Sequence, residues 1–201
     1  MSELAQLRRI HTLGKHYVPG RYGKPVATPG IRISMVHPVS IVSIITRTGK
    51  TKALDAAMLA KFGAELPHPG GTMQGRAVTF YWCGAEQYFA VATGMAEGAL
   101  YDALRTAAGD LASLSDQSHA RMMLKVEGPA VRKLLAKGTP VDLHPNVFPE
   151  DGSAVTQMAH VGVHLAASGP DGFVLSVFRG FGESFWEWLT SQAAEFGYEV
   201  R

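Results

Sequence analysis

The order of apolar patterns from residue 39 onward limits this chain to a small set of folds. A β-branched run over residues 39–47 predicts a strand, and apolar side chains at helical spacing predict a helix over residues 51–62, with Thr51 as N-cap and Gly63 as stop. Two aromatic strands, residues 77–82 and 87–93, follow as a hairpin joined at Gly84. A helix over residues 97–108 and a short strand over residues 111–114 complete a βαββαβ order, in which two helices cover one sheet face.

The second half of the chain repeats this order of elements, although no residue-level repeat is visible. Its predicted elements are a strand, a helix, a hairpin and a helix, over residues 121–126, 129–135, 157–165 with 172–178, and 183–196. We therefore predict an α+β fold of two βαββαβ-like lobes with antiparallel sheets. The first lobe is expected over residues 39–117 and the second over residues 118–201.

Residues 1–38 differ in composition and are predicted to form a basic extended arm. Residues 1–32 carry six basic side chains against Glu3, a charge of +5, whereas the rest of the chain carries 13 basic and 16 acidic residues. Scattered Gly and Pro disfavour a regular helix there. A solvated tail and an arm lying on an acidic partner both remain open. Nucleic acid is not expected as a partner, because nothing beyond this arm is basic.

The overall composition is that of a globular protein. Apolar residues make up 46% and charged residues 18% of the chain, which argues against disorder. No apolar run approaches the roughly 18 residues that a membrane-spanning helix needs, and no apolar stretch marks a signal peptide at the start. We expect no membrane contact and a cytoplasmic location.

No catalytic, cofactor-binding or metal-binding residue is expected in this chain. Cys83 lies in an apolar strand pattern and is predicted to be a buried, inert thiol. His160 and His164 are four residues apart, but in a strand that spacing spans roughly 13 Å, too far for one metal ion. The loop at Gly70 and Gly71 lacks the lysine of a phosphate-binding loop, and no nucleophile–base signature is present.

The last helix offers a candidate for contact with a partner. Trp186 falls at the edge of its apolar stripe, so it belongs either to a broad buried face or to an aromatic anchor for another protein. The candidate partner-interface residues are Arg8, Arg9, Arg21, Arg179 and Trp186.

Several segments of the second half resemble known families. Residues 116–121 (DQSHAR) and 124–129 (LKVEGP) resemble the segment that joins the lobes of folate-binding aminomethyltransferases such as the glycine-cleavage T-protein. With residues 135–145 (LAKGTPVDLHP), 159–163 (AHVGV) and 179–189 (RGFGESFWEWL), the chain is similar to the gamma subunit of heterotetrameric sarcosine oxidase. This resemblance covers about residues 116–197.

The resemblance implies a folate-binding aminomethyltransferase-like fold and a structural role in a complex. That complex oxidatively demethylates sarcosine to glycine, forming hydrogen peroxide and methylene-tetrahydrofolate. It implies alpha, beta and delta subunits as partners, which would hold FAD, FMN, NAD and zinc, while this chain would bind none of them. Two alternatives remain open: an independent folate-binding or one-carbon transfer protein, and the same subunit role in a complex oxidising another N-methyl amine.

Overall fold

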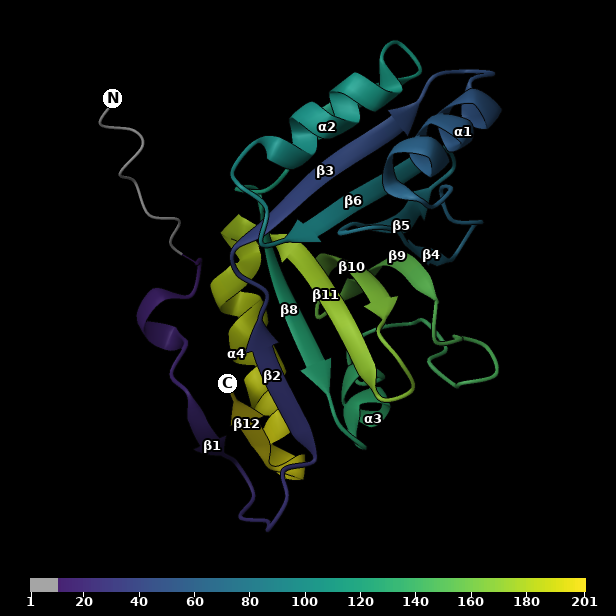
Figure 1. Cartoon of the computed structure of the whole chain (residues 1–201). Helices are drawn as coiled ribbons and strands as arrows, with labels where there is room; N and C mark the ends of the chain where they lie inside the picture. Colours follow the sequence, from purple (N-terminus) through teal and green to yellow (C-terminus); the bar gives the residue numbers. More distant parts are fainter. Residues whose placement is uncertain (1–10) are drawn as a thin grey trace, which may run out of the picture.

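A five-stranded antiparallel sheet forms from the middle of the chain in the computed structural model, which describes residues 11–201. Its strands lie in the order β4-β5-β6-β3-β7. Helices α1 and α2 lie on one face of it (Figure 1). The bounds are β3 (Val39–Thr46), α1 (Thr51–Phe62), β4 (Thr72–Gln74), β5 (Thr79–Gly84), β6 (Gln87–Thr93), α2 (Ala99–Ala108) and β7 (Ala112–Asp116). The predicted βαββαβ order is present, with β4 added at the edge.

A seven-stranded sheet forms the other half of the molecule, with strand order β1-β12-β2-β8-β11-β10-β9. Helices α3 and α4 pack on the face turned away from the five-stranded sheet (Figure 1). The bounds are β1 (Gly20–Tyr22), β2 (Ile31–Met35), β8 (Arg121–Glu127), α3 (Val131–Leu135), β9 (Ser153–Met158), β10 (Val161–Ala167), β11 (Gly172–Phe178), α4 (Gly182–Ala193) and β12 (Tyr198–Val200). Within residues 11–201, short 3-10 helices span Gly14–His16, Arg179–Phe181 and Ala194–Phe196. The α+β class with antiparallel sheets is therefore confirmed, with β2 and β12 as the one parallel pair among the described strands.

Strand β2 differs from the expectation of an extended arm over residues 1–38. It lies inside the seven-stranded sheet, parallel to β12 and antiparallel to β8. Ile31 and Ile33 are fully buried, because their alternation with Arg32 and Ser34 places both isoleucines on the helix-covered face. The strand was not predicted because it is short and lies among basic residues, Gly and Pro, which favoured an irregular arm. Residues 1–10, which include Arg8 and Arg9, lie outside the described residues.

Two local predictions were wrong. The single strand expected over residues 157–165 is interrupted by a tight turn, where Ala159 and His160 both have positive φ, and β9 and β10 pair across it. Thr51 is the first residue of α1 and not its N-cap, and its hydroxyl donates to Oε1 of Glu86 at 3.2 Å. Gly63 does end α1 in the left-handed region, as predicted.

The two sheets face each other across a third apolar cluster. Strand alternation turns the odd-numbered residues of β3, β5 and β6 toward the seven-stranded sheet. They pack there against Met123, Ala166 and Val174. The even residues of the same strands pack instead under α1 and α2. The fold is therefore four layers, helices, sheet, sheet and helices, and its polar groups between the sheets are enclosed on two sides.

Candidate functional site

Arg121 stands where the chain crosses from one sheet to the other. It is the first residue of β8 and follows a four-residue connection from β7. That connection is fixed at both ends, because Gln117 donates its N–H to the carbonyl of Ile41 at 2.8 Å and Arg179 donates its N–H to the carbonyl of Ala120 at 2.8 Å. The position of Arg121 is thus set by both sheets.

The guanidinium of Arg121 is held between two aromatic rings, one from each sheet. Its central carbon lies 4.5 Å from the ring centroid of Phe89 in β6 and 4.3 Å from that of Phe178 in β11. Burial lowers the pKa of Arg121 from its ordinary value, while the guanidinium stays charged because arginine does not lose its proton in proteins. The geometry is a cation enclosed by π faces, which favours the charged form.

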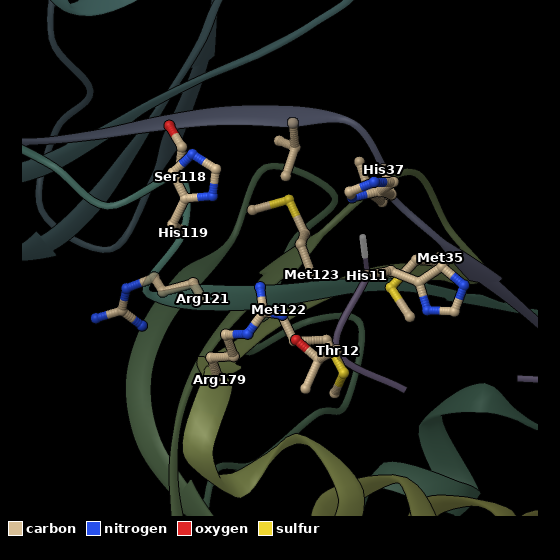
Figure 2. Close-up of a pocket in the computed structure, with 12 residues that line it drawn as sticks. His11, Thr12, Met35, His37, Ser118, His119, Arg121, Met122, Met123 and Arg179 are labelled. Carbon is tan, nitrogen blue, oxygen red and sulfur yellow. The ribbon is translucent and has the colours of Figure 1, made fainter. Parts of the chain in front are cut away.

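A small pocket opens on one side of Arg121 (Figure 2). It is lined by His11, His37 and His119 together with Arg121 and Arg179, and it holds about 30 Å³. Figure 2 shows the Arg121 guanidinium extending away from His11 and His37. Nε2 of His119 lies 2.5 Å from Oε1 of Glu97. The pocket has room for about one water molecule, and its lining is cationic.

A larger cleft of about 350 Å³ opens on the other side of Arg121, between the two sheets. We call it the inter-sheet cleft; its lining includes Cys83, Phe89, Arg121, Gly162, His164 and Phe178. A cleft of this size is within the range that small ligands or inserted side chains occupy.

His164 is 3% exposed and forms a polar link between the sheets. Its Nε2 lies 2.9 Å from Oγ of Ser153, whose hydroxyl donates to the carbonyl of Trp82 at 2.8 Å. Because that hydroxyl proton is used, the imidazole carries its proton on Nε2 and leaves a lone pair on Nδ1. Burial, and then the charge of Arg121, lower the pKa of His164 to about 4, so the ring is neutral at pH 7.

Cys83 is not an activated nucleophile in this setting. Burial raises the pKa of its thiol to about 12, although the Phe89 backbone and the charge of Arg121 act in the opposite direction. The thiol therefore stays protonated at neutral pH. The sequence predicts a buried, inert thiol, whereas Cys83 is half-buried and lines the cleft. The chemistry that the cleft can offer is hydrogen bonding and charge pairing.

The predicted interface residues are spread over the structure. Arg21 lies on β1, where its Nη1 donates to the carbonyl of Ala27 at 3.5 Å, and it does not line the pocket that holds Arg179. Trp186 is 7% exposed and packs against Tyr17, with ring centroids 5.5 Å apart. It anchors the chain's own N-terminal segment, so the buried-face interpretation of its helical position describes this structure.

The sequence reasoning missed Arg121 and His164 as a pair. The sequence offered two signals for them. Arg121 is the first residue of an otherwise apolar strand, and His164 lies within the apolar run of β10. His160, considered with His164 as a metal pair, is exposed in the turn. Within residues 11–201, no three His, Cys, Asp or Glu side chains gather closely enough to hold a metal ion. No helix among these residues is long and apolar enough to cross a membrane.

Comparison with known proteins decides the family. The model of the sarcosine oxidase gamma subunit family matches residues 48–195. This chain belongs to the sarcosine oxidase gamma subunit family. Curated gamma subunits of the family from an Arthrobacter species and from Corynebacterium sp. strain P-1 are each 32% identical to it, over 146 and 149 residues. The first match covers 70% of both chains, and the second covers 72% of this chain and 71% of the relative.

Solved structures agree with this assignment. A chain of the heterotetrameric sarcosine oxidase from Corynebacterium sp. U-96, in complex with pyrrole 2-carboxylate, matches with a TM-score of 0.75 and 27% identity, covering 85% of this chain and 88% of that one. Glycine cleavage system aminomethyltransferase T from Bartonella henselae matches with a TM-score of 0.61 and 17% identity, covering 83% of this chain and 49% of that one. The second likeness shows a shared fold. The resemblances to the gamma subunit and to the aminomethyltransferase fold are both confirmed.

Proposed function

We propose that this chain is the gamma subunit of a heterotetrameric sarcosine oxidase. The observation that carries the proposal is the match to a chain of the Corynebacterium sp. U-96 enzyme along most of both chains. Family membership over residues 48–195 supports it independently. The partners are then the alpha, beta and delta subunits of the complex.

The proposed complex oxidatively demethylates sarcosine to glycine. Oxygen is reduced to hydrogen peroxide, and the methyl carbon leaves as methylene-tetrahydrofolate. We place FAD, FMN, NAD and zinc in the other subunits, in the cytoplasm, with no membrane and no nucleic acid involved. A structural role for this chain is supported by the protonated thiol of Cys83 and by His164, whose protonated nitrogen is engaged with Ser153. Neither group is arranged as a nucleophile beside a base.

The contacts with the other subunits are proposed to include the basic side chains of the N-terminal region and of the start of the last helix. Arg21 and Arg179 are exposed in the isolated chain and can meet acidic surfaces. Arg8 and Arg9 complete this set. Trp186 contributes indirectly, by holding Tyr17 and the segment around it in place.

Co-expression with the large subunits tests the proposal. We expect a single yellow complex that oxidises sarcosine, whereas this chain purified alone is expected to be colourless. A purified chain that binds flavin would contradict the structural role. Replacing sarcosine with other N-methyl amines in the assembled enzyme tests the alternative substrate.

Titration of the isolated chain with tetrahydrofolate addresses the alternative of an independent one-carbon protein. We expect no saturable binding. Saturable binding at micromolar concentration would favour that alternative over a subunit role.

A further inference from the structure

Arg121 and His164, which line the inter-sheet cleft, and Ser176 on the neighbouring strand position have buried polar atoms that nothing in the described chain satisfies. Nε of Arg121, Nδ1 of His164 and Oγ of Ser176 are buried and have no hydrogen-bond partner. Ser176 pairs directly with His164 across β10 and β11 and with Met123 across β8 and β11, so the three groups share one face. Leaving a buried polar atom unpaired costs about 1–3 kcal/mol, so such groups favour a partner that comes from outside.

Arg121 is the charged member of these unpaired groups. Arg121 makes no ion pair with any carboxylate in residues 11–201. Its charge acts on both neighbours, since it lowers the pKa of His164 and opposes the rise in the pKa of Cys83. Arginine binds carboxylates through charge-assisted hydrogen bonds, so a carboxylate is the complementary group.

The rim of the cleft is apolar and exposed. Val155 is 58% exposed, Phe178 is 48% exposed and Ile45 is 46% exposed. Strand register directs all three toward the cleft: Val155 pairs with His164, Phe178 pairs with Arg121, and Ile45 pairs with Gln87, which lines it. Exposed apolar residues around a desolvated arginine are typical of the centre of a protein–protein interface.

We propose that the inter-sheet cleft receives an apolar segment of another subunit of the complex, and that an aspartate or glutamate on this segment binds Arg121. The inference rests on the subunit role proposed above. We expect the acidic side chain because it complements the charge of Arg121. We expect apolar residues beside it because Ile45, Val155 and Phe178 form an apolar rim. Binding would cover a cation that residues 11–201 leave without a counter-charge.

Photo-crosslinking in the assembled complex locates the occupant. Val155 is replaced by benzoylphenylalanine. Leu59 of α1, which is 47% exposed in a helical layer away from the cleft, is replaced in the same way to give the background. We expect the probe at position 155 to attach to another subunit, in a peptide with Asp or Glu among apolar residues. Attachment only to this chain, or to a segment without an acidic residue, would overturn the proposal.

Assembly affinity tests the role of Arg121. Arg121→Met should raise the dissociation constant of the complex at least tenfold, since removing one partner of a buried charge pair weakens binding strongly. Arg121→Lys should recover part of the loss, and Arg105→Met, on the exposed face of α2, should change it less than twofold. Circular dichroism checks that each variant folds. If Arg121→Met does not fold, the crosslink from position 155 alone decides whether a segment of another subunit occupies the cleft.

The outcomes separate this inference from the proposed function. If the wild-type chain fails to assemble with the large subunits, the subunit role fails and the inference fails with it. If wild type and Arg121→Met assemble equally well, the inference alone fails. Acetate could instead stabilise the isolated wild-type chain but not Arg121→Met, while the variant assembles normally. That result would show a free small carboxylate as the occupant and would overturn the proposal of a subunit segment.

Discussion

Ser153 and His164 join the two sheets through one hydroxyl. The imidazole Nε2–H of His164 donates to Oγ of Ser153 at 2.9 Å, and the same hydroxyl donates to the carbonyl of Trp82 in the other sheet at 2.8 Å. The rings of Tyr81 and Phe89 meet His164 edge-on, with centroids 5.4 and 5.5 Å away. A neutral imidazole is thus a fixed part of the contact between the sheets, and its protonation state is tied to folding.

Stability should fall in mild acid because of His164. In the unfolded chain its pKa is about 6.5, whereas in the folded chain it is about 4. Between these values the unfolded state binds more protons, so the free energy of unfolding falls as the pH falls from about 6.5 to about 4. The contribution of His164 is fully present above that window, and its loss amounts to roughly 3 kcal/mol. Urea unfolding at pH 5 and pH 7.5 measures it.

The control for this pH effect is the variant His164→Gln. It should show a shallower fall of unfolding free energy between pH 7.5 and pH 5 than wild type, whatever its absolute stability. His160→Asn changes an exposed imidazole of the same hairpin and keeps His164, so it should retain the wild-type slope. Equal slopes for His164→Gln and wild type would remove His164 as the cause.

Ser153→Ala should destabilise the chain by about 1–3 kcal/mol. The change removes the acceptor of the His164 Nε2–H and the donor to the Trp82 carbonyl, and it leaves buried groups unpaired. Ser113→Ala, at an exposed position of β7, should stay within about 0.5 kcal/mol of wild type. Chemical denaturation of both variants at pH 7.5 makes the comparison, and similar losses for the two would contradict the structural role of Ser153.

Cys83 should react slowly with thiol reagents in the folded chain. With its pKa raised to about 12, roughly a thousandth of the ordinary thiolate fraction is present at pH 8. Iodoacetamide labelling followed by mass spectrometry should therefore be much slower in buffer than in 6 M guanidinium, where the same thiol is free of the fold. Comparable rates in both would show that Cys83 is accessible and ionisable.

Periodicity predicted most of the elements in this chain because each lobe buries one face of its sheet under helices. The β-branched run of β3 and the hairpin of β5 and β6 alternate cleanly between two apolar clusters, and α1 begins and ends at the predicted residues. Strand β2 was not predicted, because it pairs with β8 and β12, which lie about 90 and 165 residues further along the chain. Local patterns carry no information on such long-range pairing.

The site was less predictable than the fold. Arg121 and Phe178 are cross-strand partners, and Phe89 comes from the other sheet, so the enclosed guanidinium exists only after both sheets have packed. The turn at Ala159 and His160 was missed because neither position holds Gly, Pro, Asn, Asp or Ser, the residues that usually mark a turn. Without that turn His164 was assigned to a long strand, and its place between the sheets could not be derived.

Two of the segments that carry the family resemblance touch at Gly138 and Trp188. A methyl group on Gly138 would overlap the indole of Trp188 and lie 2.9 Å from Cγ of Met158. Gly138→Ala should therefore lower stability by about 1–3 kcal/mol and the melting temperature by roughly 3–10 °C. In Gly162→Ala the added methyl meets nothing within 4 Å, so melting should hardly change. Calorimetry on both variants tests this, and an unaffected Gly138→Ala would mean that the glycine is not retained for its contact with Trp188.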